Sequence, residues 1–176
     1  WVKPTAPPAT GHVGTIFSMD SPWFGGAPIG LYLAVSPGGS LIGRAGFGIS
    51  GSPAGVYAVS SLPVTFGQWN HVVLSWFQTG ELSMYLNGKL AGQVQHAPAQ
   101  PLSWAGTSYG NAIFGIGYDI DLGVGAEPFT GSIDELVLAG GSSASDGIDG
   151  QDAAAGQAAS GYPPGPSVPP LVLDPN

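Results

Sequence analysis

Acidic side chains are the residues of this sequence best suited to acid–base chemistry, because eleven Asp and Glu stand against three Lys and Arg. A retaining glycosidase needs two carboxylates about 5–5.5 Å apart, close to the spacing of alternate residues on one face of a strand. Asp119 and Asp121 form the one acid-x-acid pair, and they stand in a Gly-rich segment that predicts a loop. Asp134 and Glu135 are adjacent and would point to opposite faces of a strand. The sequence therefore favours a protein that is not an enzyme.

Asp119 and Asp121 are also the best candidates for a calcium site. Ca²⁺ takes about six to eight oxygen ligands, and the carbonyl groups of a Gly-rich loop can supply several of them. No third carboxylate stands nearby, so the alternative is a solvated acidic loop. The histidines His12, His71 and His96 lack the spacing of a zinc site, and there is no cysteine. No cofactor is required by these patterns, and calcium is the candidate cation.

Aromatic residues in two predicted loops are candidates for carbohydrate binding. Trp23 and Phe24 share one loop, and Trp104 and Tyr109 share another, in which Asn111 is a polar partner. An exposed aromatic face can stack on a sugar ring while polar groups bind its hydroxyls. The alternative is that these aromatic side chains cap the ends of the fold.

The elements that must position these residues are predicted to be short β-strands. In Pro28–Val35 every second residue is aliphatic, as in a strand with one buried face. Similar segments recur about every 10 residues, separated by turns that the thirty Gly and seventeen Pro favour. No segment has a convincing helical period. The pattern predicts an all-β fold, a two-sheet antiparallel jelly-roll sandwich. The predicted strands are Trp1–Lys3, His12–Met19, Pro28–Val35, Ser40–Ile49, Val56–Ser60, three within Gln68–Gln95, Ala112–Tyr118 and Gly131–Ala139.

The stretch Gln68–Gly92 organises the rest of the sequence as three consecutive antiparallel strands. The first of them is apolar on both faces, as expected of a strand inside a sandwich. The dipeptide Asn87-Gly88 predicts a two-residue hairpin turn, because both residues tolerate positive φ. On the returning strand, Leu90 and Val94 are expected on one side and the charged and amide side chains on the other.

Three segments give the sequence a resemblance to a known family. They are Trp-x-His-Val at residues 69–72 with Leu-x-Met-Tyr-Leu-Asn-Gly-Lys at 82–89, Trp-Val-Lys-Pro at 1–4, and Phe-Thr-Gly-Ser-Ile-Asp-Glu-Leu at 129–136. In order and spacing they resemble the laminin G-like, concanavalin A-like lectin/glucanase family over Trp1–Ala139. The resemblance implies the jelly-roll fold. It does not select a function, since this fold carries lectins, glycosidases, adhesion modules and spacers.

The resemblance adds three expectations about particular residues. Related folds sometimes tie the closing strand to the start of the chain through a cation, which makes Asp134 a second calcium candidate. The alternative is a buried Asp134 that accepts backbone N–H groups. The family's glucanase motif of acids at alternate positions is absent, and a strand before Trp1 is expected to be missing from the sequence.

The charge of the sequence limits its partners and its compartment. Charged residues make up 8% of the chain and the net charge is −8, so phosphate backbones and anionic lipid are repelled. No apolar run reaches the roughly 20 residues of a membrane span. These features exclude nucleic acid and membrane insertion. Three basic residues leave few trypsin-type cleavage sites, which suits an extracellular, cell-surface or virion-surface location.

The composition changes after Ala139. Residues 140–160 are a Gly/Ser/Ala/Asp linker with little to bury, and 161–176 form a Pro-rich segment expected to be extended. One reading of this Gly/Ala/Pro-rich tail is a linker to another domain. The other is an assembly strand that docks on an open sheet edge of its own sandwich or of another subunit. Its apolar strip consists of Val168, Leu171, Val172 and Leu173.

The sequence as a whole predicts a non-enzymatic, exposed surface module for adhesion, decoration or assembly of a virion or cell surface, with carbohydrate binding as its accessory property. One alternative is a glycan-binding lectin domain of a larger secreted protein. A β-glucan hydrolase is the less favoured alternative, because the acid pair is poorly placed.

Overall fold

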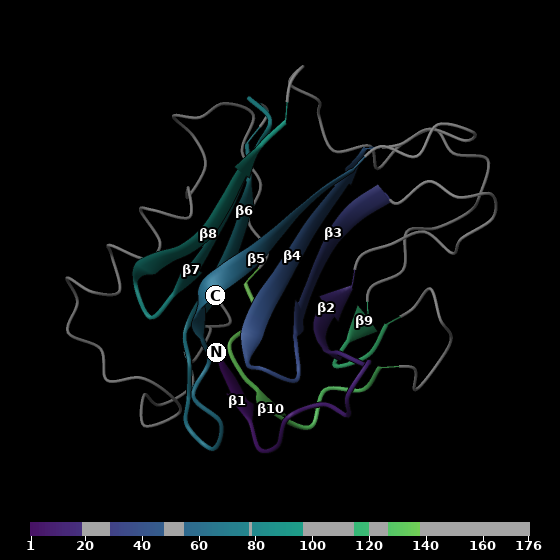
Figure 1. Cartoon of the computed structure of the whole chain (residues 1–176), viewed down its shortest axis with the longest axis vertical. Helices are drawn as coiled ribbons and strands as arrows, with labels where there is room; N and C mark the ends of the chain where they lie inside the picture. Colours follow the sequence, from purple (N-terminus) through teal and green to yellow (C-terminus); the bar gives the residue numbers. More distant parts are fainter. Residues whose placement is uncertain (19–28, 48–54, 78, 97–114, 120–126, 138–176) are drawn as a thin grey trace, which may run out of the picture.

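The computed structural model describes residues 1–18, 29–47, 55–77, 79–96, 115–119 and 127–137 (Figure 1). Over these ranges the chain forms ten β-strands and contains no helix of membrane-spanning length and apolarity. Each strand overlaps one that the sequence predicts. They are β1 (Val2–Pro4), β2 (Gly14–Ser18), β3 (Ile29–Val35), β4 (Ser40–Phe47), β5 (Gly55–Pro63), β6 (Val72–Trp76), β7 (Glu81–Leu86), β8 (Lys89–Gln95), β9 (Gly115–Ile116) and β10 (Gly131–Ile133).

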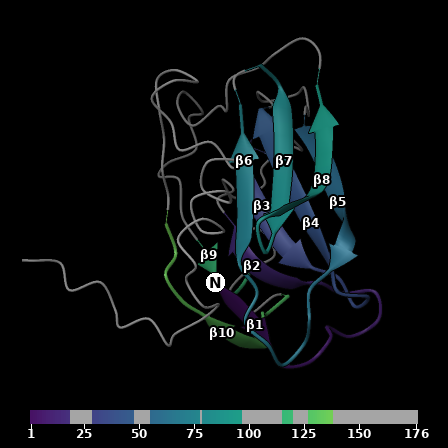
Figure 2. The same ribbon diagram turned by 90° about the vertical axis from the view of Figure 1, so that its left-hand side faces the viewer.

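Eight of the ten strands form two antiparallel sheets that pack face to face, which confirms the predicted jelly-roll sandwich. One sheet has five strands in the order β5-β4-β3-β2-β9, and the other has three in the order β6-β7-β8. Figure 2 shows the three-stranded sheet in front of the longer strands of the five-stranded sheet. The pair β1-β10 lies at one end, where Val2 also forms a bridge with Asn70.

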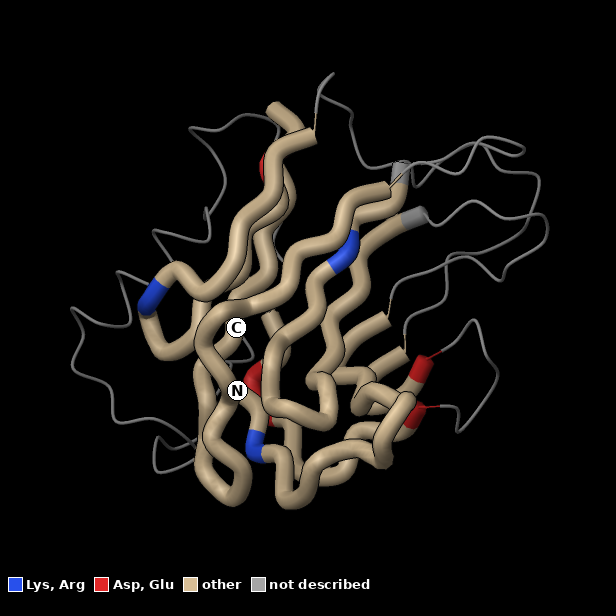
Figure 3. The backbone as a smooth tube through the Cα atoms, viewed as in Figure 1, with Lys and Arg blue, Asp and Glu red and all other residues tan. Residues whose placement is uncertain are grey.

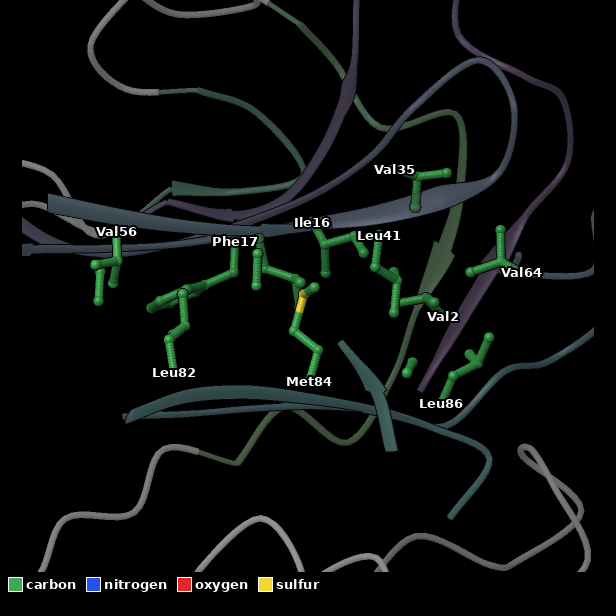
Figure 4. Close-up of a cluster of buried hydrophobic side chains, with 14 residues drawn as sticks. Val2, Ile16, Phe17, Val35, Leu41, Val56, Val64, Leu82, Met84 and Leu86 are labelled. Atoms are coloured by element: carbon green, nitrogen blue, oxygen red, sulfur yellow. The ribbon is translucent and has the colours of Figure 1, made fainter. Parts of the chain in front are cut away.

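The core lies between the inner faces of the two sheets (Figure 4). Because side chains alternate along a strand, the longer strands contribute every second residue to this layer, while the register shift between Thr15 and Phe17 lets β2 contribute both Ile16 and Phe17. In β7, for example, Leu82 and Met84 are fully buried against the other sheet. The fully or nearly fully buried aliphatic and aromatic residues include Val2, Ile16, Phe17, Val35, Leu41, Val56, Val64, Leu82, Met84 and Leu86.

The β7–β8 hairpin confirms the predicted turn but not the predicted face of Leu90. Asn87 has φ 51° and Gly88 has φ 77°, as a two-residue turn of this kind requires. The register then shifts between Met84 and Tyr85, so Tyr85 pairs with Leu90 and Ala91 is the extra residue of a bulge. Leu90 therefore points away from the core and is 48% exposed.

The last strand is shorter than the predicted Gly131–Ala139. β10 ends at Ile133, and Glu135 has φ 50°, which an extended strand does not allow. The backbone N–H of Glu135 instead donates to the Asp134 carboxylate at 2.9 Å. β1 and β10 are joined directly by backbone pairing, in the register Val2 to Ile133.

Candidate functional site

Most of the site residues that the sequence predicts lie outside the described residues. This holds for the loop aromatics with their polar partner, for one of the three acids, and for the apolar strip of the tail. They are Trp23, Phe24, Trp104, Tyr109, Asn111, Asp121, Val168, Leu171, Val172 and Leu173. Asp119 and Asp134 are described.

The two described acids lie in different surroundings. Asp134 is exposed, and its backbone N–H donates to the Trp1 carbonyl at 2.9 Å, so the closing strand is tied to the start of the chain by the backbone. The expected alternative of a buried Asp134 is wrong. Asp119 is 8% exposed. The described ranges contain no group of three or more His, Cys, Asp or Glu side chains suited to a metal ion.

One group of polar and aromatic side chains lies on the outer face of the five-stranded sheet, the face directed away from the core. The strand registers place Tyr57 opposite Arg44, Arg44 opposite Tyr32, and Tyr32 opposite Ser18. Ser18 in turn pairs with Gly115 of β9. These five residues form one row across all five strands, called here the cross-strand row.

One end of the cross-strand row is open to solvent. Tyr57 of β5 is 59% exposed, and Val59, two residues along the same face, is 62% exposed. Opposite residues of an antiparallel pair have Cβ atoms about 4.5–5.5 Å apart, so Tyr57 and Arg44 are neighbours. The Arg44 guanidinium lies over the Tyr32 ring, with Cζ 5.1 Å from the ring centroid. Arg44, on β4, is the cation of the five-stranded sheet (Figure 3).

The other end of the row is a buried hydrogen-bond network around Tyr32. The Tyr32 hydroxyl donates to Glu127 Oε2 at 3.4 Å and lies 3.2 Å from Thr15 Oγ1. The Tyr32 hydroxyl has one proton, which it donates to Glu127. The Thr15 hydroxyl is therefore the donor in the hydrogen bond between Thr15 and Tyr32. Burial raises the pKa of Tyr32 well above its ordinary value, the Thr15 hydrogen bond opposes this rise, and the carboxylates of Glu127 and Asp119 add to it. Tyr32 is therefore a neutral donor throughout the physiological range.

The backbone holds Glu127 in place for this contact. Its carbonyl accepts the Thr15 N–H at 3.0 Å, and its φ of 47° lies in the left-handed region. A residue other than Gly, Asn or Asp in that region costs about 1 kcal/mol, which the surrounding structure must offset. The strained backbone carries the Glu127 carboxylate toward Tyr32.

A second buried hydroxyl lies in the cross-strand row. Ser18 is fully buried, and its Oγ has no hydrogen-bond partner among the described residues. A buried polar group without a partner is unusual and costs about 1–3 kcal/mol. The row thus presents an exposed aromatic ring beside a guanidinium at one end, whereas the hydroxyls of Thr15, Ser18 and Tyr32 at the other end are buried. The exposed ring can stack on the apolar face of a ligand.

The sequence does not single out this row, although it contains a usable signal. Tyr32 stands at a position that the alternation of β3 assigns to the face away from the core. Arg44 is the one arginine in the chain. An isolated cation and an aromatic residue on the outward phase of neighbouring strands would have indicated a site, but only the strand register shows that they meet.

The match to a protein family agrees with this architecture. A family model described as the concanavalin A-like lectin/glucanases superfamily matches residues 1–144. Among solved structures, the chain is similar to the Ruminococcus gnavus IT-sialidase CBM40, with 14% sequence identity and a TM-score of 0.49, over 76% of this chain and 68% of that one. No curated protein has a significant match to the sequence.

Proposed function

The chain belongs to the concanavalin A-like lectin/glucanases superfamily, and from that premise we propose that it binds carbohydrate without cleaving it. The proposed binding surface is the outer face of the five-stranded sheet, at the open end of the cross-strand row. The observation that carries the proposal is the exposed ring of Tyr57 directly opposite Arg44.

The chemistry of this end of the row suits a sugar ring. A pyranose has an apolar C–H face and a rim of hydroxyl groups. Tyr57 offers a largely exposed ring for the apolar face, and Val59 extends this surface by one exposed aliphatic side chain. The guanidinium of Arg44 lies opposite Tyr57 in the strand register and stacks on the Tyr32 ring, so it places a fixed positive charge beside the apolar surface.

The proposal of a non-enzymatic protein is supported by the surroundings of the two acids beside Tyr32. Glycoside hydrolysis needs two carboxylates that flank the scissile bond. Asp119 is 8% exposed and Glu127 is hydrogen-bonded to Tyr32, so neither is presented freely to a substrate. A β-glucan hydrolase is the competing proposal. It requires turnover of a β-glucan that Asp119→Asn or Glu127→Gln abolishes.

We place the module on an exposed surface, as an adhesion or decoration domain of a cell or virion or as a lectin domain of a larger secreted protein. The scarcity of Lys and Arg supports this location, because it leaves few sites for trypsin-like proteases. Resistance of the folded chain to trypsin, compared with a nonspecific protease, tests the argument. Cleavage by trypsin at Arg44 or Lys89 in the folded state would contradict it.

Calcium is proposed as an accessory ion at Asp119 and Asp121, and no cofactor is proposed as required. Of the two acids, only Asp119 lies within the described residues. It is close enough to Tyr32 to raise the pKa of the Tyr32 hydroxyl. If calcium binds there, the melting temperature should rise in CaCl₂ relative to EDTA, and Asp119→Asn should remove the rise. An unchanged melting temperature would exclude calcium.

A glycan array with the intact chain and point variants tests the binding surface. Tyr57→Ala should weaken binding by about tenfold, since a stacked aromatic ring contributes on the order of 1 kcal/mol beyond its buried area. Tyr57→Phe should retain most of the affinity. Leu90→Ala is the matched control, because Leu90 is also an exposed apolar residue but lies on the outer face of the other sheet. Equal binding by Tyr57→Ala and Leu90→Ala would remove this surface from the proposal.

The loop aromatics form the second candidate surface for the same function. This surface is proposed from the sequence alone, because its residues lie outside the described ranges. They are Trp23, Phe24, Trp104, Tyr109 and Asn111. Trp23→Ala and Trp104→Ala on the same array separate the two surfaces. Loss of binding in these variants with retention in Tyr57→Ala would move the site to the loops, and no binding by the intact chain would end the proposal.

A further inference from the structure

The turn Asn87-Gly88 between β7 and β8 has a chemical reactivity that its role in the hairpin does not use. The side-chain carbonyl of an Asn that precedes Gly can be attacked by the backbone nitrogen of the Gly, because no Cβ atom hinders the approach. Asn87 is exposed, and Leu86 pairs with Lys89 across the turn. The Gly88 N–H lies between these two residues and takes no part in their pairing. The carboxamide of Asn87 and the nitrogen of Gly88 are thus both available at the tip of the hairpin.

The Asn87 side chain is held by the backbone that leads into β6. Its Oδ1 accepts the His71 N–H at 2.8 Å, and the Asn87 N–H donates to the His71 carbonyl at 2.8 Å. Since Asn87 has φ 51°, its backbone leaves the direction of the strand, and the side-chain oxygen takes the place of a ladder carbonyl. This hydrogen bond fixes the Asn87 carboxamide and draws electron density from its carbonyl carbon.

The same hydrogen bond lies where negative charge develops when the carboxamide reacts. If a nitrogen adds to Asn87 Cγ, the charge of the tetrahedral intermediate is carried by Oδ1. A backbone N–H that already points at this oxygen stabilises the charge, as oxyanion donors do in acyl transfer. The nucleophile belongs to the next residue, so the two reacting groups need no encounter through solution.

We propose that Asn87 is a site of spontaneous deamidation in the folded protein. The Gly88 nitrogen forms a bond to Asn87 Cγ, and its proton passes through water to the Asn87 Nδ2 group, which leaves as ammonia. The product is a five-membered succinimide ring. Water then adds to one of the two ring carbonyl groups and opens the ring. The result is aspartate, or isoaspartate in which the main chain runs through the former side-chain carbonyl.

The isoaspartate product should weaken the hairpin and its contact with β6. It adds one atom to the main chain of a two-residue turn, and the carbonyl that accepted the His71 N–H becomes part of that main chain. The geometry of the turn sets the register of the two strands, so the added atom strains the pairing of Leu86 with Lys89. Deamidation at this turn would therefore lower the stability of the three-stranded sheet.

Incubation of the intact folded chain at mildly alkaline pH, followed by peptide mapping with mass spectrometry, tests the proposal. Isoaspartate is identified as a peptide with the mass of the Asp form that elutes separately from a synthetic Asp peptide. We expect conversion at Asn87 to be at least about tenfold faster than at Asn70, because Asn70 is buried and reacts only after local opening. Asn87→Gln should show no conversion at this position over the same time.

Urea at concentrations below the unfolding transition distinguishes a reaction of the folded chain from one that requires opening. The rate at Asn87 should not change with this urea, because the reacting groups are accessible in the folded state. A rate that rises with urea would show that the His71 hydrogen bond protects the carboxamide, and would overturn the proposal. An incubated chain that keeps its carboxamide at residue 87 would overturn it as well.

The variant Asn87→Asp is the matched control for the effect on stability. It has the charge of the product but a main chain of normal length, so its melting temperature should stay close to that of the intact chain. The isolated isoaspartate form should melt a few degrees lower. Equal melting temperatures of these two proteins would show that the hairpin accommodates the added atom. This inference does not depend on the glycan-binding proposal, which concerns the other sheet.

Discussion

Asn70 is a buried amide that fixes the loop before β6, with 1% of its side chain exposed. Its Oδ1 accepts the Thr65 N–H at 2.9 Å, and its Nδ2 donates to the carbonyls of Thr65 and Gln68 at 3.0 and 2.8 Å. Asn70→Ala would leave three backbone groups without these partners. Since an unsatisfied buried group costs about 1–3 kcal/mol, we expect a loss of about 3 kcal/mol in the free energy of unfolding.

Urea unfolding followed by tryptophan fluorescence measures this loss. Gln93→Ala is the control, because Gln93 is exposed on β8 and should change the free energy of unfolding by less than about 0.5 kcal/mol. A similarly small change in Asn70→Ala would show that water replaces the three hydrogen bonds without penalty.

His71 should make the stability of the protein depend on pH. Its ring packs against Trp1 with the ring centroids 5.0 Å apart, and its buried Nδ1 has no hydrogen bond among the described residues. Burial, followed by the charged amino group at Trp1, lowers the pKa of His71 from 6.5 to about 4. Between these pH values the unfolded state binds a proton that the folded state does not. Stability is therefore complete above about pH 6.5 and falls as the pH decreases toward 4.

The contribution of His71 is isolated by comparing the urea midpoint of the intact protein with that of His71→Gln at pH 7.5 and pH 5. Many carboxylates also affect stability at low pH, so the difference between the two proteins is the informative quantity. His71→Gln should lose less stability between the two pH values than the intact protein does. His12→Gln, at an exposed position, should follow the intact protein. Parallel behaviour of all three would contradict the prediction.

At the scale of elements, the two sheets lie in close contact where β8 passes β5. A Cβ atom on Gly92 would lie 2.9 Å from the Val59 carbonyl oxygen and 3.0 Å from Met84 Cε. The Ser61 hydroxyl also donates to the Ala91 carbonyl at 3.1 Å across this seam. Because a backbone carbonyl cannot move aside without shifting β5, Gly92→Ala should destabilise the protein by about 1–3 kcal/mol.

Gly38→Ala is the matched control for this seam. A Cβ atom at Gly38 would meet only Ser36 Oγ at 3.9 Å, which is ordinary contact. Thermal unfolding of both variants should show a lower melting temperature for Gly92→Ala and a nearly unchanged one for Gly38→Ala. Equal melting temperatures would mean that the two edges separate at little cost.

The elements could be predicted because their signals are local. Alternation locates the ten strands, and Asn87-Gly88 specifies its own turn through the positive φ of both residues. The bulge at Ala91 has no such signal, and one extra residue moves Leu90 to the opposite face. The early end of β10 at Glu135 likewise depends on a backbone conformation that the residue type does not demand.

The candidate site was not predictable in the same way, because it depends on register. Tyr57, Arg44 and Tyr32 belong to three strands, and only the pairing of these strands places them in one row. The sequence favours aromatic residues in loops as sugar-binding candidates, since it reveals exposure in loops more readily than exposure on a sheet face. Glu127 reaches Tyr32 through contacts with Thr15, more than a hundred residues away in the chain, which no local pattern encodes.

At the scale of the whole molecule, the net charge of −8 opposes the local attraction of Arg44. The net negative charge of the whole protein repels anionic ligands over distances of about a Debye length, near 10 Å at 0.1 M salt. A guanidinium beside an exposed ring instead attracts a carboxylate or sulfate in direct contact. The dependence of affinity on salt shows which of the two effects dominates at the cross-strand row.

For a neutral oligosaccharide we expect an affinity that changes by less than about twofold between low salt and about 0.3 M NaCl, because stacking and neutral hydrogen bonds are little screened. A uronate-containing oligosaccharide of the same length should bind more tightly as salt rises if repulsion by the whole protein dominates, and more weakly if pairing with Arg44 dominates. Calorimetry of both ligands with the intact protein and Arg44→Gln separates these cases, since Arg44→Gln removes only the second. A neutral ligand whose affinity falls steeply with salt would show that binding is ionic and that Tyr57 is not its main contact.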